Sequence, residues 1–196
     1  MTRRIDHELI EGLVPEGATV LDLACGEGDL LDKLITRKHV HGSGVEIDQS
    51  AVEKCVARGL SVFHGDLDAG LADFSDQSHD IVILSLSLQQ LRRPRMIVRE
   101  MVRVGRLAIV SFPNFAHWPN RLSVLRVRMP VTRRLPYQWY DTPNIRVGTY
   151  KDFEVLAHKN QLRILDSFGL QDDRAVRLWP NARAGTAVFH FERGGA

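Results

Sequence analysis

Short apolar runs alternate with segments of helical periodicity along most of the chain. Residues 19–23 (Thr-Val-Leu-Asp-Leu) form the first run, and its nearly continuous apolar character is typical of a strand buried on both faces. Residues 29–36 follow, with leucines at helical spacing. Because strand-like and helical patterns keep alternating in this way, the sequence predicts βαβ units around a parallel sheet.

The same patterns predict seven strands and about six helices. Further strands are expected at 42–47, 61–64, 80–85, 107–112, 162–168 and 186–192, and further helices at 6–13, 49–58, 94–104 and after residue 149. Gly59 is a typical helix end, and Thr149 with Asp152 is a typical helix start. We therefore predict an α/β, Rossmann-like fold with a mostly parallel seven-stranded sheet and helices on both faces.

Residues 113–148 depart from this alternation. They contain four prolines beyond Pro113, at positions 119, 130, 136 and 143, and no sustained period. Such a stretch is too long for a simple connector, and long excursions of this kind are usually functional. We predict a single domain over residues 1–196, with a lid or docking insertion at 113–148 after the fifth strand.

The composition is that of an ordinary globular protein. Hydrophobic residues make up 44% of the 196 positions and charged residues 26%, a balance that disfavours disorder. No apolar run approaches the roughly 20 residues of a membrane helix, and the N-terminus turns polar at once instead of entering a signal core. Cys25 and Cys55 belong to no CxxC or Cys/His cluster, so we expect neither disulfides nor a metal site. We expect a cytoplasmic location and no membrane partner.

The net charge is only +2, but the arginines are concentrated in two basic stretches. Residues 92–106 hold six arginines against Glu100, and residues 114–150 hold six against Asp141. Such stretches attract nucleic acids, anionic substrates or acidic partners, or simply form a solvated face. Because no nucleic-acid-binding motif accompanies them, nucleic acid is not a favoured partner.

The strand at 19–23 runs into Gly26-x-Gly28 and then directly into a helix. In open parallel sheets, ligands bind outside the carboxyl ends of the strands. Glycine there lets the backbone approach a ligand and adopt positive φ. Asp22, at the end of the strand, can orient this turn or the amino group of a ligand. Cys25 is interpreted as a small packing residue because no histidine partner is placed beside it.

Acidic residues also stand at the ends of the next two strands. Glu46 ends the second strand, where its carboxylate can accept both hydroxyls of a ribose, each bond contributing roughly 1.5–3 kcal/mol. Asp66 follows the third strand, where it can accept from an adenine amino group while Leu67 supplies its backbone amide. Each acid alone is more often a solvated or capping residue, but three strand ends in succession favour an adenosyl ligand.

A dinucleotide site is the main alternative for this glycine turn. The G-x-G-x-x-G fingerprint wants a small residue at position 31, where this chain has Leu31. That fold also holds a pyrophosphate at the helix N-terminus, whereas Glu27 and Asp29 place negative charge there. A dinucleotide site is therefore disfavoured by both size and charge, and the negative charge suits a cationic sulfonium ligand.

Residues 21–28 (Leu-Asp-Leu-Ala-Cys-Gly-Glu-Gly) resemble the first motif of class I S-adenosylmethionine-dependent methyltransferases, with Ala24 where the usual pattern has glycine. The resemblance implies that S-adenosylmethionine or S-adenosylhomocysteine binds along the strand ends. It gives no catalytic residue. The candidate cofactor-binding residues are Asp22, Ala24, Cys25, Gly26, Glu27, Gly28, Glu46, Ile47, Gly65, Asp66, Leu67, Ser85 and Leu86.

Longer stretches, at 111–118, 128–132 and 135–145, resemble the MetW family of methionine biosynthesis proteins, and the similarity covers roughly residues 5–170. The resemblance implies a methyltransferase-fold protein that works beside homoserine O-acyltransferase. It implies no methyl acceptor.

Two functions remain open. One is a protein that binds the adenosyl ligand and regulates the acyltransferase, docked on residues 113–148. The other is an active methyltransferase on an unidentified small molecule. Methyl transfer depends mainly on positioning, and a nearby base assists some acceptors. His117, Tyr137, Tyr140 and Asp141 are the candidate bases.

Overall fold

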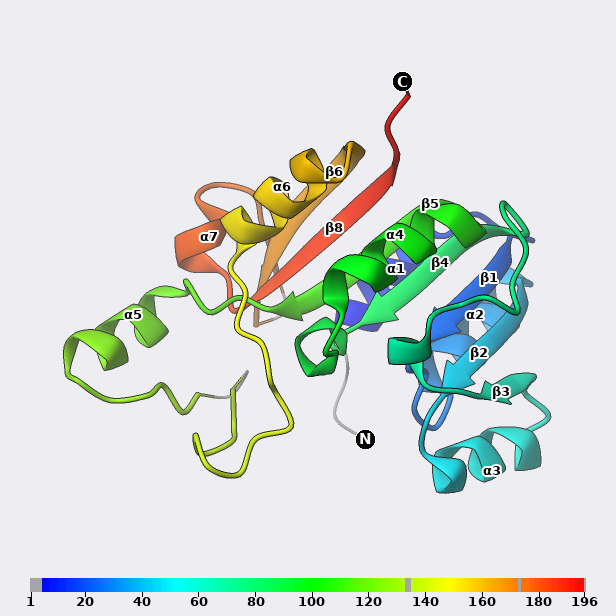
Figure 1. Ribbon diagram of the computed structural model, residues 1–196, viewed down its shortest axis with the longest axis horizontal. Coiled ribbons are helices and arrows are strands. Elements are labelled where there is room, and N and C mark those ends of the chain that lie inside the picture. Colours follow the sequence, from blue (N-terminus) through cyan, green and yellow to red (C-terminus); the bar gives the residue numbers. More distant parts are fainter. Residues whose placement is uncertain (1–4, 133–134, 173, 196) are drawn as a thin grey trace. The chain divides into compact units, whose positions relative to one another are not determined.

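The computed structural model describes residues 5–132, 135–172 and 174–195 (Figure 1). Their contacts divide the chain into two compact units, one of Met1–Ser85 and Arg93–Val110, the other of Leu86–Arg92 and Ser111–Ala196. Strand β5 (Gly105–Pro113) runs from the first unit into the second. The strand order is β3-β2-β1-β4-β5-β8-β6-β7.

The first unit contains the parallel strands that the apolar runs predict. Strand β1 lies between β2 and β4 and pairs in parallel with both, and β2 pairs in parallel with β3. Leu21 and Leu23 of β1 are fully buried, as expected for a central strand covered on both faces. The bounds are β1 Thr19–Leu23, β2 His41–Glu46, β3 Val62–His64 and β4 His79–Ser85.

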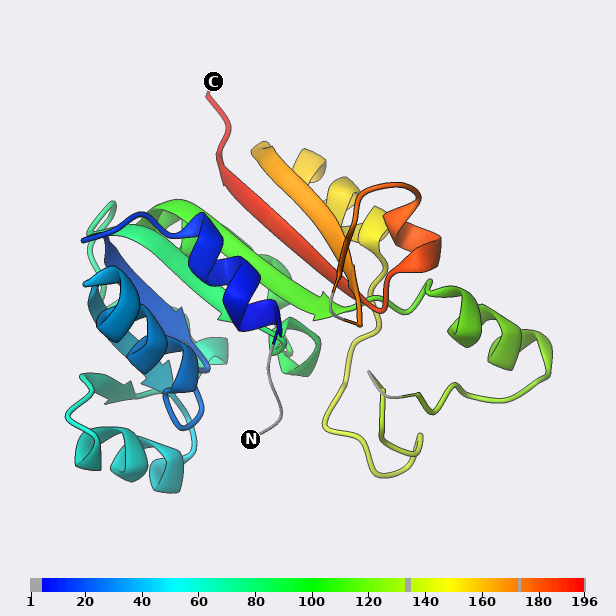
Figure 2. The ribbon, with the colours of Figure 1, turned by 180° about the vertical axis from the view of Figure 1, so that it is seen from behind.

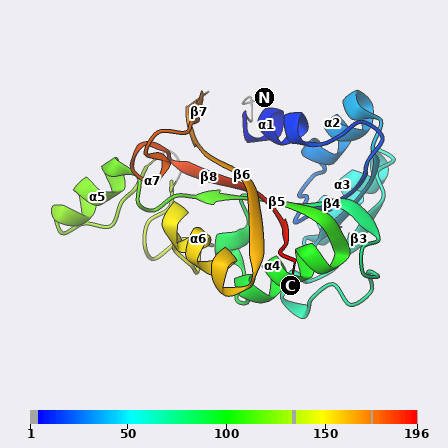
Figure 3. The same cartoon turned by 90° about the horizontal axis from the view of Figure 1, so that it is seen from above.

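Helices cover both faces of this unit. Helix α4 (Pro94–Val104) lies on the face opposite to α1 (Ile5–Leu13) and α2 (Asp29–Lys38), as Figures 2 and 3 show. Helix α3 (Gln49–Ala57) packs against β2 and β3, and a 3₁₀ turn, η1 (Leu67–Ala69), follows β3. Each helix buries one apolar stripe, for example Leu30, Leu31 and Leu34 of α2, which is what its periodicity predicts.

The second unit is antiparallel. Strand β6 (Leu162–Gln171) pairs with β8 (Thr186–Arg193) and with the short β7 (Arg174–Val176). Helix α6 (Tyr150–Lys159) packs on β6. The core of the second unit is aromatic: the ring centroids of Phe153 and Phe189 lie 4.4 Å apart, and the Phe112 ring stacks on Phe189. The remaining helices are η2 (Leu88–Gln90), α5 (Trp118–Leu125) and α7 (Pro180–Arg183).

The predicted α/β fold with a mostly parallel sheet is confirmed, but the prediction of seven strands was wrong. The sheet has eight strands, because β7 was missed. Strand β7 has only three residues, so it shows no alternation of apolar and polar positions. It is formed by backbone pairing of residues 174–176 with 169–171 of β6, which the sequence pattern does not reveal.

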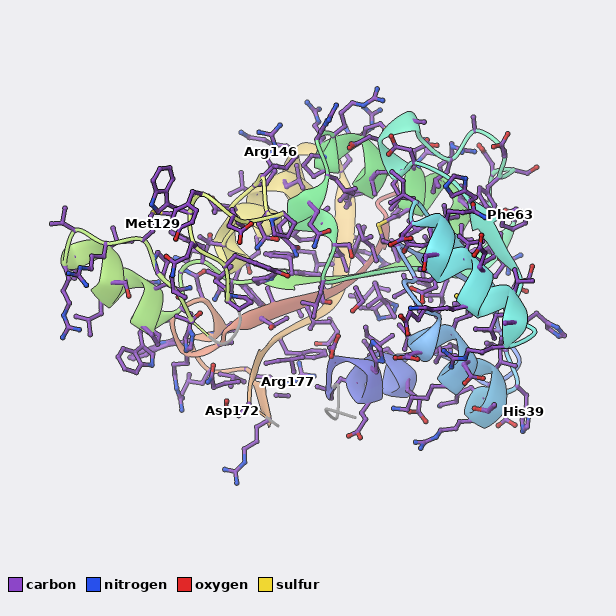
Figure 4. All side chains as sticks on the ribbon, turned by 90° about the horizontal axis from the view of Figure 1, so that it is seen from below. His39, Phe63, Met129, Arg146, Asp172 and Arg177 are labelled. Atoms are coloured by element: carbon purple, nitrogen blue, oxygen red, sulfur yellow. The ribbon has the colours of Figure 1, made fainter. Side chains whose placement is uncertain are left out.

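Residues 113–148 are tied together at their two ends by a bridge between Asn114 and Gly148. Between them lie α5 and two stretches of coil, residues 126–132 with Met129 and residues 135–147 with Arg146 (Figure 4). This stretch exposes many large apolar side chains, at positions 118, 122, 124, 125, 127, 129, 131, 137, 139, 140, 145 and 147. Its role as an insertion stays a prediction, and two of its six arginines, Arg133 and Arg134, lie outside the described residues.

The described residues include no candidate membrane span and no candidate metal cluster. None of their helices combines the length and the apolar character needed to cross a membrane. Nor do they contain a group of three or more His, Cys, Asp or Glu side chains that could hold a metal ion.

Candidate functional site

The turn after β1 has an unusual backbone. Ala24, Gly26 and Gly28 all have positive φ, of 50°, 57° and 79°. A Cβ on Gly28 would lie 2.4 Å from Leu60 Cδ1, so this glycine allows close packing inside the protein. A Cβ on Gly26 would meet no atom within 4 Å. The two glycines therefore serve different purposes, and only Gly26 borders open space.

Ala24 is the one residue of this turn that departs from the resembled motif. Its positive φ explains why glycine is usual there, because a left-handed conformation costs an L-residue with a Cβ roughly 1–2 kcal/mol. The turn is kept in this shape by neighbouring main-chain bonds. Cys25 N–H donates to Val45 O at 3.2 Å, and Gly28 N–H donates to Cys25 O at 3.0 Å.

Glu46 connects the end of β2 to this turn. Its Oε2 accepts from Gly26 N–H at 2.8 Å, while Oε1 accepts from the N–H groups of Ile47 and Asp48, each at 2.9 Å. The side chain is only 8% exposed. A carboxylate oxygen can accept two hydrogen bonds, and Oε2 is engaged by one in the described structure. Glu46 therefore both shapes the turn and retains capacity to accept from a hydroxyl group.

The ends of β2 and β3 bring four more predicted residues together. Glu46 and His64 are paired in register, and Gly65 N–H donates to Glu46 O at 2.9 Å. The Ile47 side chain beside them is 61% exposed and offers an apolar surface. Asp66 is exposed and caps η1 by accepting from Asp68 N–H through Oδ1. Leu67 is buried below this edge.

Asp22 and Ser85 lie at the carboxyl ends of β1 and β4. Asp22 is buried, in register with Gly44 of β2. Ser85 Oγ donates to Asp6 Oδ2 of α1 at 3.1 Å. Asp6 and its neighbour His7 are both buried polar residues of the first unit, and sequence reasoning missed them. The sequence feature that could have indicated them is the pair of polar residues at the start of an otherwise amphipathic helix.

Leu86 is the one predicted cofactor residue that belongs to the second unit. Its φ is 54°, and its N–H donates to Ser111 O at 3.0 Å and lies 3.1 Å from Ser111 Oγ. The other predicted residues all lie in the first unit.

The negative charge predicted at the start of α2 is paired, and this corrects one argument from the sequence. Lys54 Nζ lies 2.5 Å from Glu27, and Arg58 contacts Asp29 at 2.9 Å and Asp32 at 2.6 Å. Sequence reasoning missed both cations, although they lie four residues apart on α3 and its C-cap. The charge argument against a diphosphate is therefore lost. The steric argument against a dinucleotide site remains, because that fingerprint needs a small residue at position 31, and the large Leu31 found there is fully buried.

Both cysteines pack beneath the turn. Cys55 Sγ donates to Gly26 O at 3.3 Å, and Cys55 belongs to a small apolar cluster with Leu31 and Leu60. Burial, reinforced by the negative charge of nearby Asp22, raises the pKa of the Cys25 thiol well above its usual range. A protonated thiol is a poor nucleophile, which supports the interpretation of Cys25 as a packing residue.

The four candidate bases all lie in the second unit. His117 is buried at the start of α5, and burial lowers the pKa of its imidazole. Its Nε2 has no hydrogen-bond partner among the described residues. Tyr137, Tyr140 and Asp141 are exposed. Only His117 combines burial with an unused polar atom.

Comparisons with known proteins agree on family and fold. The model of the family described as "Methionine biosynthesis protein MetW" matches residues 4–191. The bifunctional methionine biosynthesis protein MetXA/MetW of Rhodopirellula baltica is 35% identical over 207 residues. That match covers 98% of this chain and 33% of the relative, so the chain spans about a third of that protein's length.

Solved structures of methyltransferases share the fold. An S-adenosylmethionine-dependent methyltransferase from Mesorhizobium loti matches with a TM-score of 0.69 at 14% identity, over 97% of this chain and 98% of that one. A TehB-like methyltransferase from Corynebacterium glutamicum matches with a TM-score of 0.66 at 16% identity, over 96% and 87%. At these identities the likeness shows the fold alone.

The positive φ of Ala24 leads to a test of the turn. Ala24→Gly is expected to stabilise the protein by about 1 kcal/mol, because it removes left-handed strain. Ala57→Gly, at an exposed helical position of α3, is the matched control and is expected to destabilise by roughly 0.5–1 kcal/mol. Urea unfolding measures both. Equal losses in the two variants would contradict a strained Ala24.

Proposed function

This chain belongs to the MetW family of methionine biosynthesis proteins, and on that premise we propose that it binds S-adenosylmethionine or S-adenosylhomocysteine at the turn after β1 and supports homoserine O-acyltransferase. The observation that carries the binding proposal is the geometry of Glu46. Its buried carboxylate is held by three N–H groups next to Gly26, whose α-carbon borders space free of protein atoms.

The residues at this edge fit an adenosyl ligand. Glu46 Oε2 can accept from a ribose hydroxyl, and the exposed Ile47 side chain can pack on a flat base. Asp66 is exposed to solvent and its Oδ2 accepts no hydrogen bond among the described residues, so it can accept from an exocyclic amino group. When bound, S-adenosylmethionine supplies a methyl group on a positively charged sulfur. The chain's own residues bind and orient it.

Support of an acyltransferase is the second part of the proposal. In the Rhodopirellula baltica relative, MetXA and MetW occur in one polypeptide, which favours physical association between an acyltransferase and a MetW protein. Residues 113–148 are the proposed docking segment, since they expose apolar side chains such as Leu125, at 80%, and Trp139. Exposed apolar patches of this extent typically mark protein interfaces.

Methyl transfer to a small molecule is the alternative, and one observation favours it. His117 is buried, its pKa is lowered by that burial, and its Nε2 is unpartnered among the described residues. An imidazole of this kind is neutral at pH 7 and can accept a proton from an acceptor group.

Removing the Glu46 carboxylate tests the binding site. Glu46→Ala is expected to weaken S-adenosylhomocysteine binding by about 10-fold or more, because charged hydrogen bonds are lost. Glu53→Ala, an exposed change on α3, is the matched control and is expected to leave the affinity unchanged. Isothermal titration calorimetry measures both. Unchanged affinity in Glu46→Ala would refute the role of this acid.

Reconstitution tests the acyltransferase proposal. Adding the chain to a homoserine O-acyltransferase from the same organism is expected to raise the rate of acyl transfer and to produce co-elution in gel filtration. Leu125→Asp should abolish both effects, whereas Val155→Asp, at an exposed apolar position of α6 outside the segment, should retain them. No change in rate or elution with the native chain would contradict the proposal.

The alternative predicts a different result. Incubating the chain with methyl-labelled S-adenosylmethionine and a cell metabolite extract is expected to yield a labelled product if methyl transfer is the function, and His117→Ala should lower its yield by about 10²-fold or more. Scintillation counting of the separated products measures this. Label that stays entirely on the cofactor would remove the support for catalysis.

A further inference from the structure

The second unit contains a pocket of about 360 Å³ that the proposed function does not use. Pockets for small molecules usually measure roughly 300–1,000 Å³, so this one lies at the small end of the range. Its walls come from α5, from the first two turns of α6 and from the chain around α7. They are lined by Arg121, Tyr150, Lys151, Glu154, Trp179, Pro180, Asn181 and Ala182.

One buried amide holds two of these walls. Asn114 is 1% exposed, and its Nδ2 donates to Asn181 O at 3.0 Å and to Ala184 O at 2.8 Å, at the two ends of α7. Its Oδ1 accepts from Tyr150 N–H, at the first residue of α6, at 3.2 Å. Because a single side chain bonds to both helices, these walls are joined without a ligand, and a preformed pocket lowers the entropy cost of binding.

The conformation of Trp179 also points to a binding role. It has φ 52° and ψ 50°, a left-handed conformation that bulky residues rarely adopt. Its carbonyl accepts from the N–H groups of Ala182 and Arg183, both at 3.0 Å, which maintains this conformation. The indole nevertheless stays 73% exposed at the pocket. Strained residues of this kind cluster at ligand clamps. Because the Trp179 ring is exposed, its burial does not contribute to the stability of the fold, and the ring is available to contact a ligand.

The charged groups of the pocket carry both signs of charge. Among the described residues, Lys151 and Glu154 form no ion pair, and Arg121 donates only to a carbonyl, Ala116 O. Two other exposed arginines of the same unit are paired, Arg177 with Asp166 and Arg163 with Glu192. Asn181 Oδ1 is buried and has no hydrogen-bond partner within the described part of the chain.

We propose that this pocket binds a free α-amino acid with an apolar side chain. The ligand carboxylate pairs with Lys151 and Arg121. The ligand ammonium pairs with Glu154. The apolar side chain packs against Trp179 and Pro180. A ligand with only one charge would leave either the cations or the carboxylate of this pocket unpartnered, so the arrangement selects a zwitterion.

Calorimetric titration of the full chain with L-methionine and L-leucine tests the proposal. Both are expected to bind, whereas L-methionine methyl ester, which lacks the carboxylate, and desamino-methionine, which lacks the ammonium, should each bind at least 10-fold more weakly. Lys151→Gln is expected to weaken L-methionine binding by about 10-fold. Lys159→Gln, at an exposed position in the last turn of α6, is the matched control and should bind as the native chain does.

Glu154→Gln supplies a second, independent test. This variant should lose the preference for L-methionine over desamino-methionine while keeping the native unfolding temperature. The Glu46→Ala chain should keep full affinity for L-methionine, so a failure of the adenosyl site and a failure of this pocket give different results. Absence of binding at millimolar L-methionine, equal binding of the singly charged analogues, or equal affinities of Lys151→Gln and Lys159→Gln would each overturn the proposal.

Discussion

The hydrogen bond from Gly26 N–H to Glu46 Oε2 is the interaction on which the candidate site depends. It joins the turn after β1 to the end of β2, and the two further N–H groups bound by Oε1 keep the carboxylate oriented. The turn is thereby held with Gly26 open to solvent space and Gly28 packed on Leu60 and Cys55. Glu46 therefore supports the backbone of the candidate site in addition to its proposed role in ligand binding.

In the second unit, a neutral buried side chain joins separate segments of the chain in a similar way. Asn114 is buried and exchanges hydrogen bonds with main-chain groups of α6 and of the chain around α7. In both units a buried polar residue is satisfied by main-chain groups from segments far apart in the sequence, and an exposed apolar side chain lies nearby, Ile47 in one and Trp179 in the other. Polar networks that are fully satisfied give rigid local geometry. This rigidity is what a binding surface requires.

The charge at the start of α2 is one feature that the sequence alone predicted wrongly. Glu27 and Asp29 stand at a helix N-terminus, and by position alone they give it negative charge. In the structure Lys54 and Arg58 approach from α3 and pair with them. Charges that lie far apart in the sequence are paired when the chain folds, so the proposal of an adenosyl site rests on the open glycine and the strand-end acids. Strand β7 was missed for a related reason, because its stability comes from backbone pairing with β6 rather than from its own side chains.

The sequence by itself determined the order of strands and helices in the parallel part, the glycine turn, and the acids at three strand ends, because these depend on local periodicity and on residue types that few positions tolerate. It also determined the family, through motifs spread over most of the chain. Only the tertiary structure decided that Glu46 holds the turn, that Asp6 and His7 are buried, and that Asn114 joins α6 to α7. These are contacts between segments many residues apart, and the partner of a polar side chain is fixed by packing that no local pattern records.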